Sequence, residues 1–395
     1  MSQTLKFGNG TWATKKGSTL AYNDEDGNFK PLPFTYTGAG KGTRVNKEGL
    51  IEVVENDRPR IDYLDSEKGA LLLEPSRTNL YAYSEDFSNA AWTKSAATVA
   101  LTSNISPDGT TNSVYNLTGT NANLYTGGTT GIEHTISIYA KSNGQGKDNF
   151  KLRLGNSLSS LITVTDEWVR YEFTATPTTN VFGLTVDSSP NNQWDILIWG
   201  AQLEQGSYAT SYIPTQGSAQ TRVQETASGS GNSEVFNDSQ GVLFANIAAN
   251  ADDLTQRVIS INDGGSSDYI HIRYHTLSNY IRFIVRSGSV TSFDYAIQVA
   301  NILLPNKIVV KYDSSTVYLW VNGFEQFTYS PIVPPLGLSE LSFDDSLGNN
   351  PFYGKTKEIA YYDEILTDLE LETLTSYRTW EAMVKELNLN IIHNE

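Results

Sequence analysis

The chain has 395 residues, a formal net charge of −16 at pH 7 and no cysteine. This acidity argues against a nucleic-acid partner, because such binding depends on lysine and arginine neutralising phosphates. The lack of thiols excludes disulfides and thiolate chemistry. No apolar run approaches the ~20 residues of a membrane helix, and residues 1–10 lack the apolar core of a signal peptide. We therefore expect no membrane insertion and no export signal.

The composition favours β-strands. The chain has 22 tyrosines, 15 phenylalanines and 31 glycines but only two methionines, a balance typical of many short strands joined by turns. The length allows two or three domains. We predict an all-β chain with two antiparallel β-sandwich (jelly-roll) domains in tandem, an irregular N-terminal segment and a C-terminal helix.

Residues 1–75 are rich in Gly, Asn, Asp, Lys and Pro, and their short apolar patches, such as 71–73, are separated by turn signals. This stretch looks too irregular to form a core of its own. We therefore predict an N-terminal attachment segment rather than a domain.

The next region, residues 76–223, contains strand after strand. Alternating or wholly apolar runs occupy residues 135–140, 151–154, 168–175 and 196–199, which indicates a first sandwich. Residues 224–235 have almost nothing to bury and are predicted to be a flexible linker.

A second strand series lies within residues 236–375, with runs at 269–274, 280–286, 307–312 and 316–321, and it predicts a second sandwich. Tight turns are expected at residues 313–315 and at Asn322-Gly323. After Thr367, a possible N-cap, apolar residues recur at helical spacing as far as Leu387. We assign residues 376–395 to this helix and a tail.

Two neighbouring segments, 69–80 (GALLLEPSRTNL) and 83–94 (YSEDFSNAAWTK), resemble a block found in bacteriophage tail and virion structural proteins. The strands at 136–141, 168–175 and 198–215 continue it in an order that looks like a jelly-roll carbohydrate-binding module. The opening residues, 5–13, 28–34 and 43–46, resemble the N-terminal segment of related phage proteins, which would attach the chain to the particle.

The C-terminal domain is similar to the concanavalin A-like lectin/glucanase superfamily in its laminin-G-like form, in residues 307–313, 317–323, 354–362 and 366–368. Together the resemblances imply a phage virion surface protein of the tail-fibre or receptor-binding type. Such a protein is assembled in the host cytoplasm and acts outside the cell. Its implied partners are host-surface polysaccharide and other virion proteins, the latter contacted through the N-terminal segment. By analogy with phage fibres it would be a homotrimer.

Catalysis is not expected. Glucanases of this superfamily place acidic residues alternately on one strand, and no such triplet occurs. The acidic clusters at 52–57 and 343–346 lie in turn-rich sequence. The four histidines (His134, His271, His275 and His393) accompany no Gly-x-Ser-x-Gly elbow. We therefore predict no catalytic residue and a protein that is not an enzyme.

A basic hairpin is the main candidate for a binding site. In a strand, His271, Arg273 and His275 share one face, and Tyr280 and Arg282 alternate in the same way on the next strand. The central cation argues against zinc. These five residues are either the solvent side of an amphipathic hairpin or a site for anionic glycan. The opposite face would fill the core with Ile270, Ile272, Tyr274, Ile281, Phe283 and Val285.

The tryptophans divide by their surroundings. Trp199 and Trp320 lie inside apolar strands and are predicted to be core residues. Trp92, Trp168 and Trp194 flank loops with Asn or Asp and are candidates for stacking on sugar, which requires exposed rings.

Oxygen ligands cluster at Asp263 and Asp268 and again at Asp344 and Asp345, which suits calcium, although neither cluster has EF-hand spacing. We expect no other cofactor.

Two other functions remain open at this point. The chain could be a head or tail decoration or assembly protein whose sandwiches have no saccharide site. It could also be a spike that cleaves polysaccharide, which would require a pair of carboxylates ~5–10 Å apart across a groove.

Overall fold

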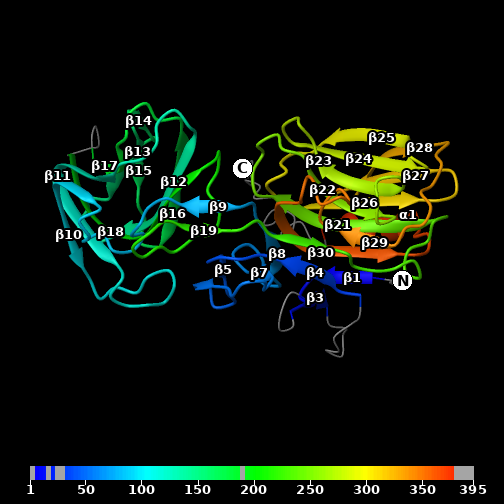
Figure 1. Cartoon of the computed structure of the whole chain (residues 1–395), viewed down its shortest axis with the longest axis horizontal. Coiled ribbons are helices and arrows are strands. Elements are labelled where there is room, and N and C mark those ends of the chain that lie inside the picture. Colours follow the sequence, from blue (N-terminus) through cyan, green and yellow to red (C-terminus); the bar gives the residue numbers. More distant parts are fainter. Residues whose placement is uncertain (1–4, 15–18, 23–31, 187–191, 378–395) are drawn as a thin grey trace, which may run out of the picture. The chain divides into compact units, whose positions relative to one another are not determined.

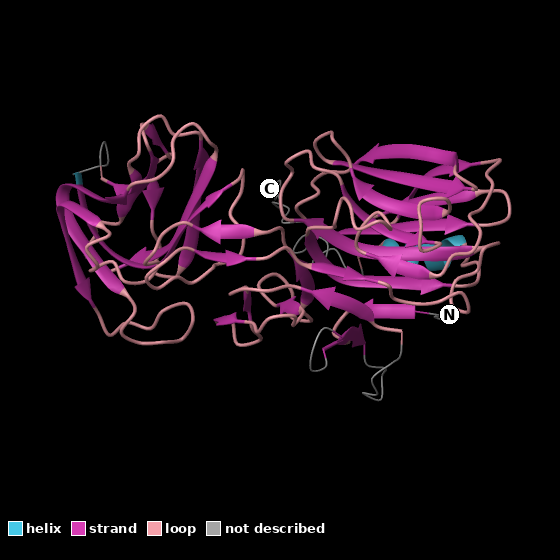
Figure 2. Ribbon diagram, viewed as in Figure 1, coloured by secondary structure: helices cyan, strands magenta, loops and turns pink. Residues whose placement is uncertain are grey.

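The computed structural model describes residues 5–14, 19–22, 32–186 and 192–377. The described chain is built of antiparallel strands with one short helix (Figure 2), which confirms the prediction of an all-β fold. It divides into two compact units. We call residues 39–56 and 76–223 the first sandwich, and residues 1–38, 57–75 and 224–395 the second sandwich.

The first sandwich is a nine-stranded sheet, counted over its described residues, that folds around one core. Its central strand, β11, pairs with β18 along its first half and with β17 along its second half, so it belongs to both layers. The strand order is β14-β13-β17-β11-β18-β12-β16, with β10 beside β11 and β15 beside β13. The strands are β10 (Thr93–Leu101), β11 (Tyr115–Thr126), β12 (His134–Ser142), β13 (Asn149–Leu154), β14 (Ser157–Leu158), β15 (Ile162–Thr163), β16 (Val169–Ala175), β17 (Phe182–Thr185) and β18 (Gln193–Gln205).

Two short strand pairs complete the first sandwich. They are β5 (Thr43–Val45) with β6 (Ile51–Val53), and β9 (Arg77–Asn79) with β19 (Gln220–Arg222).

The second sandwich has two main sheets (Figure 1). The larger, eight-stranded over the described residues, has the order β28-β27-β26-β21-β30-β8-β7, with β1 beside β30. Its strands are β1 (Leu5–Gly8), β7 (Arg60–Asp62), β8 (Ala70–Leu73), β21 (Gly241–Ala249), β26 (Asn306–Tyr312), β27 (Val317–Val321), β28 (Phe324–Tyr329) and β30 (Gly354–Tyr362). Trp320, on β27, is buried as predicted.

The smaller sheet of the second sandwich has five strands in the described chain, in the order β25-β24-β23-β22-β29. They are β22 (Arg257–Asn262), β23 (Tyr269–Tyr274), β24 (Tyr280–Ser287), β25 (Val290–Gln298) and β29 (Glu340–Ser342). A minor sheet joins β2 (Trp12–Thr14), β3 (Thr19–Tyr22), β4 (Phe34–Thr37) and β20 (Thr226–Ser228). One hydrophobic core contains side chains from all three sheets.

The N-terminal residues differ from the expected separate segment. β1 pairs with β30, with Leu5 opposite Tyr361, and β8 pairs with the other end of β30, with Leu71 opposite Thr356. Residues 43–53 instead form strands of the first sandwich. The short apolar patches do not need a core of their own, because they fill cores completed by strands hundreds of residues away.

The segment 224–235 also differs from the flexible linker expected there. β20 pairs with β4, and Ser230 forms a bridge with Leu341. Ala227 and Ser230 are fully buried. Backbone hydrogen bonds to neighbouring strands hold this segment, and a search for apolar residues cannot detect such bonds.

A buried charge cluster fastens this segment to β7. Arg60 is ion-paired with Glu74 and Glu225, and the Tyr36 hydroxyl donates to Glu225 at 2.6 Å. The backbone N–H of Glu74 also donates to Glu225, at 2.9 Å. None of the three charged side chains is more than 4% exposed. We call Arg60, Glu74, Glu225 and Tyr36 the buried cluster.

The helix α1 (Asp368–Thr375) covers the outer face of the eight-stranded sheet, where Leu366 and Leu371 pack on Phe244 and Tyr362. Thr367 caps it in a capping box with Glu370, which confirms the predicted N-cap. The helix α1 ends at Thr375, and the remaining predicted helical residues from 378 onward lie outside the described chain. The predicted turn at Asn322-Gly323 is confirmed, since both residues have positive φ. Over the described residues, no helix combines the length and the apolar character needed to cross a membrane.

Candidate functional site

The five-stranded sheet of the second sandwich turns one face to the core and the other outward. The six residues predicted to be in the core are all buried: Ile270, Ile272, Tyr274, Ile281, Phe283 and Val285. Because side chains alternate along a strand, the residues between them lie on the outer face. The period-two interpretation of this hairpin is therefore correct.

On that outer face the hairpin brings basic and aromatic side chains together. Arg273 lies directly opposite Arg282, and Tyr269 lies opposite Arg286. The face also carries His275 and Tyr280, whose rings are 6.2 Å apart. All of these side chains are partly exposed. We call this set the basic face: Tyr269, Arg273, His275, Tyr280, Arg282 and Arg286.

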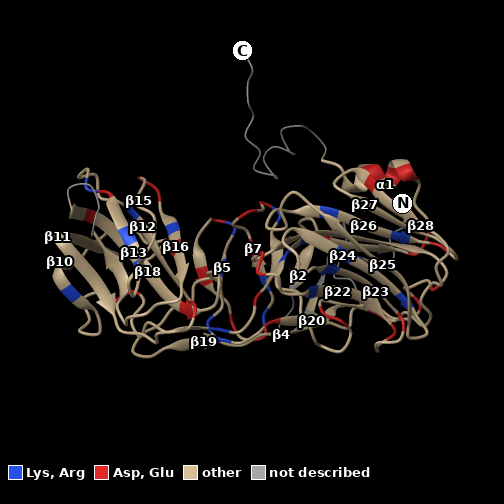
Figure 3. Cartoon of the chain, turned by 90° about the horizontal axis from the view of Figure 1, so that it is seen from above, with Lys and Arg blue, Asp and Glu red and all other residues tan. Residues whose placement is uncertain are grey.

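Among the described residues, one carboxylate, that of Asp294, is ion-paired with an arginine of the basic face. Asp294 of β25 binds Arg282 through both carboxylate oxygens, one of them 2.6 Å from Nε. Arg273 donates to Gln256 at 3.3 Å, and its Nε has no hydrogen-bond partner in the described structure. Burial and then the charge of Arg282 lower the pKa of Arg273. The two positive charges of Arg273 and Arg282 therefore exceed the single negative charge of Asp294, the described carboxylate bound beside them. The helix α1, in contrast, carries acidic side chains (Figure 3).

His271 was predicted to lie at the surface with the other hairpin residues, but the structure buries it. It is only 4% exposed, and the ring of Tyr269 stacks on it with centroids 3.7 Å apart and planes 8° apart. Burial, followed by the charges of Arg273 and Arg286, lowers the pKa of His271 to about 3. The imidazole is therefore neutral at physiological pH, and it packs against the ring of Tyr269. The structure places all five predicted hairpin residues on one face, but His271 is covered.

The pKa of His275 is also lowered, by burial and then by Arg282 and Arg273. Because the usual value of ~6.5 already leaves most histidine neutral at pH 7, the arginines supply the positive charge of this face.

Two of the three candidate tryptophans are buried, so they cannot stack on a sugar. Trp92 is 2% exposed, donates from Nε1 to the carbonyl of Tyr83 at 2.8 Å, and packs against Tyr81 and Phe87. Trp194 is 1% exposed. Its ring lies against Gly119, where a Cβ atom would come within 2.9 Å of Nε1. Both rings fill the core of the first sandwich, although polar loops precede them in sequence.

Trp168 alone of the three is partly exposed. Its Nε1 donates to the carbonyl of Ile105 at 3.0 Å, and Lys141 lies 5.9 Å from the ring centroid. The ring packs at the margin of a small cluster that contains Trp199, which is buried as predicted. Trp168 lies in the first sandwich, whereas the basic face lies in the second.

The four aspartates considered for calcium accept backbone N–H groups. Asp263 accepts from Gly265, Asp268 from Gly288 and Leu336, Asp344 from Ser346, and Asp345 from Leu347 and Asn349. In the described chain, no three Asp, Glu or His side chains gather as a metal site would require. These carboxylates hold turns.

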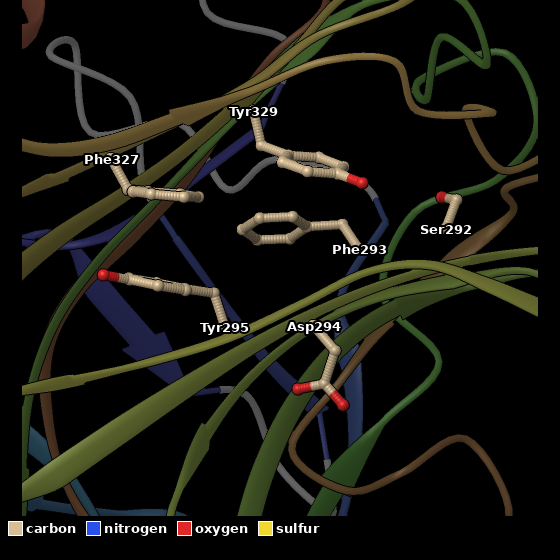
Figure 4. A pocket seen from close by; sticks show the side chains of 6 residues that line it. All are labelled: Ser292, Phe293, Asp294, Tyr295, Phe327 and Tyr329. Atoms are coloured by element: carbon tan, nitrogen blue, oxygen red, sulfur yellow. The ribbon is translucent and has the colours of Figure 1, made fainter.

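An aromatic pocket of about 210 Å³ lies beside the basic face and was not predicted. Its six lining residues come from β25 and β28 (Figure 4): Ser292, Phe293, Asp294, Tyr295, Phe327 and Tyr329. Neither β25 nor β28 was among the runs predicted to be strands. That β25 and β28 face each other across two sheets was not visible in the sequence.

Two of the solved structures to which this chain is similar resemble it remotely. No protein-family model matches the chain, and no curated protein matches it. The CBM40 of the Ruminococcus gnavus IT-sialidase, solved with α2,3-sialyllactose, is 17% identical over 35% of this chain and 84% of its own, with a TM-score of 0.31. Domain 4 of AbnA, a GH43 extracellular arabinanase from Geobacillus stearothermophilus, solved with arabinotriose, is 13% identical over 43% and 83%, with a TM-score of 0.32. At such TM-scores the function has to be argued from the chain's own geometry.

Proposed function

We propose that this chain is a non-catalytic glycan-binding protein that recognises acidic saccharide through the basic face of its second sandwich. The observation that carries the proposal is the pairing of Arg273 with Arg282 in register, with Asp294 as the one carboxylate bound to them in the described structure. Like charges directly opposite each other destabilise a sheet. A bound anion would relieve that repulsion.

The geometry of the basic face suits a sugar carboxylate. Guanidinium groups bind carboxylates through two parallel hydrogen bonds. Arg273 is partly exposed, and its described hydrogen bond is a long one, 3.3 Å, to Gln256. Tyr280 supplies a flat ring beside the arginines, on which the C–H face of a pyranose can pack. The ring of Tyr269 is already stacked on His271, and Arg286 lies 5.8 Å from its centroid. A sialic or uronic acid offers both kinds of group in one residue.

The binding mode we propose requires no chemical step. The carboxylates nearest to these arginines do not form a free pair, since Asp294 is bound to Arg282. The acidic cluster at 52–57 is similarly engaged, with Glu52 paired to Arg44 and Asp57 accepting from Gly38. If several copies are present on one particle, their individually weak contacts with a glycan combine into a much higher overall affinity, or avidity.

The proposed setting is the surface of a phage particle, as a tail-fibre or receptor-binding protein that assembles in the host cytoplasm and acts outside the cell. The support for this setting, for virion partners and for a homotrimer is the sequence resemblance in residues 69–94 and 5–46. Attachment through residues 1–75 would have to use surfaces of strands that also complete the sandwiches.

The test is a glycan array of sialylated, uronic-acid and neutral saccharides, probed with the wild type and with an Arg273→Ala/Arg282→Ala variant. An Arg44→Ala/Lys151→Ala variant is the matched control, because it removes the same charge from the first sandwich. We expect saturable binding to acidic glycans in the wild type and the control, lost in the basic-face variant.

Two results would overturn the proposal. Equal binding by all three proteins would place recognition elsewhere. No binding of the wild type to any acidic glycan would favour a decoration or assembly role, and release of reducing sugar from a bound glycan would show an enzyme.

A further inference from the structure

The aromatic pocket lies between two strands that each end a sheet. β25 is the last strand of the five-stranded sheet and β28 is the last of the eight-stranded sheet, as far as the chain is described. Tyr295 stacks on Phe327 with centroids 4.0 Å apart and planes 6° apart, and Phe293 lies 5.5 Å from Tyr329 (Figure 4). Phe293 is 4% exposed and Tyr329 is 40% exposed, so the pocket runs from the core to the surface.

The polar groups of the pocket are uncharged or already paired. Ser292 donates to the carbonyl of Val333 at 3.0 Å, and Asp294 is held by Arg282 on the other side of β25. The hydroxyls of Tyr295 and Tyr329 have no hydrogen-bond partner among the described residues. The pocket thus combines flat apolar walls with two phenol groups that can each donate and accept.

The four rings close the edge of the sandwich without filling it, because they leave a hollow that opens to solvent beside the exposed ring of Tyr329. The observed cavity of about 210 Å³ is below the ~300 Å³ at which pockets for drug-sized ligands begin. A ligand of one ring fits that volume better than a chain of rings.

We infer that the aromatic pocket is a saccharide subsite for one uncharged pyranose ring, distinct from the basic face. A neutral sugar presents C–H groups to the aromatic walls and hydroxyls to Tyr295 and Tyr329. An anion would find no unpaired cation among the lining residues. This subsite does not depend on acidic glycan binding to the basic face, and either site can exist without the other.

Saturation-transfer NMR with the methyl glycosides of glucose, galactose and N-acetylglucosamine tests the subsite. We expect transfer from the wild type to at least one glycoside and a several-fold loss in Tyr329→Ala. Phe324→Ala is the matched control, because Phe324 lies on the same strand, is 70% exposed and does not line the pocket. Its transfer should equal that of the wild type.

An Arg273→Ala variant separates the two sites, because Arg282 holds Asp294 of the pocket whereas Arg273 is hydrogen-bonded to Gln256, which does not line it. Retained transfer in this variant supports a subsite independent of the basic face, whereas its loss would assign the signal to the basic face and overturn the inference. No transfer to any of the three glycosides, or equal loss in Phe324→Ala, would also overturn it. If Tyr329→Ala fails to fold, Tyr329→Phe replaces it: weaker transfer supports the role of the hydroxyl, and unchanged transfer contradicts it.

Discussion

The second sandwich uses arginine in two opposite ways. In the buried cluster, Arg60 is 1% exposed and is shared by the carboxylates of Glu74 and Glu225. On the basic face, Arg273 and Arg282 are partly exposed and have one carboxylate between them, that of Asp294. Negative charge exceeds positive charge in the first set, and the reverse holds in the second.

The difference separates an arginine that holds the fold from an arginine that is available to a ligand. Burying a guanidinium without partners costs free energy, and the carboxylates of Glu74 and Glu225 compensate for this cost at Arg60. A partly exposed guanidinium can remain under-paired because water solvates it until an anion arrives. Burial and pairing together, rather than residue type, therefore indicate which arginines bind.

The largest effect is expected at the buried cluster. Arg60→Met should reduce the free energy of unfolding by ~3–5 kcal/mol, because it leaves two buried carboxylates without their cation. Urea denaturation followed by circular dichroism measures this change. Arg44→Met is the control, since its pair with Glu52 is exposed and should contribute less than ~1 kcal/mol. A similar loss in both variants would remove the distinction between the two kinds of arginine.

A conservative change on the basic face should affect binding rather than stability. Arg273→Lys keeps the charge but loses the planar fork, so affinity for an acidic oligosaccharide should fall by ~10-fold. The free energy of unfolding should change by less than ~1 kcal/mol. Isothermal titration calorimetry gives the affinity and urea denaturation gives the stability. Unaltered affinity would show that Arg273 acts only as a point charge or does not bind.

The buried imidazole beneath Tyr269 predicts a pH dependence of stability. The pKa of His271 is about 3 in the folded chain, against ~6.5 when unfolded, so the unfolded chain binds more protons between these values. Stability conferred by the neutral ring is present above pH ~6.5 and is lost as the pH falls toward 3. As the pH is lowered from 7 to 5, the free energy of unfolding should therefore fall by ~1–2 kcal/mol less in His271→Phe than in the wild type.

Parallel urea titrations of the wild type and His271→Phe at both pH values check this prediction, since the other titrating groups are common to the two proteins. Identical losses would mean that His271 is accessible and titrates normally.

The smallest effect is expected from the carboxylate that shields Arg282. Asp294→Asn removes the ion pair and should raise affinity for an acidic oligosaccharide by a few-fold, with a steeper dependence on salt. Fluorescence anisotropy of a labelled oligosaccharide at two salt concentrations measures both quantities. Weaker binding in this variant would mean that Asp294 positions Arg282 rather than competes for it.

Local periodicity predicted the basic face well. Alternation at 269–274 and 280–286 gave the strands, the core residues and the shared face of Arg273 and Arg282. It did not predict the burial of His271, which depends on the stacked ring of Tyr269. Trp194 illustrates the same limit, because its burial depends on contact with Gly119, 75 positions earlier.

Features that depend on long-range pairing were not predictable from local pattern. β1 fits its sheet only because Leu5 pairs opposite Tyr361, and no local signal in residues 1–75 reveals that partner. The aromatic pocket requires β25 and β28 to face each other, although they belong to different sheets. Neither strand was among the predicted runs, and no local pattern indicates that the two lie face to face.

The basic face is proposed to recognise the carboxylate of an acidic glycan. The most direct measurement is a calorimetric titration of the wild-type chain with one acidic oligosaccharide, such as a trigalacturonate, before and after chemical reduction of its carboxyl groups to alcohols. We expect saturable binding to the acidic form and at least ~10-fold weaker binding to the reduced form. Equal binding to both forms would show that the arginines of the basic face do not read the anion, and would contradict the proposal.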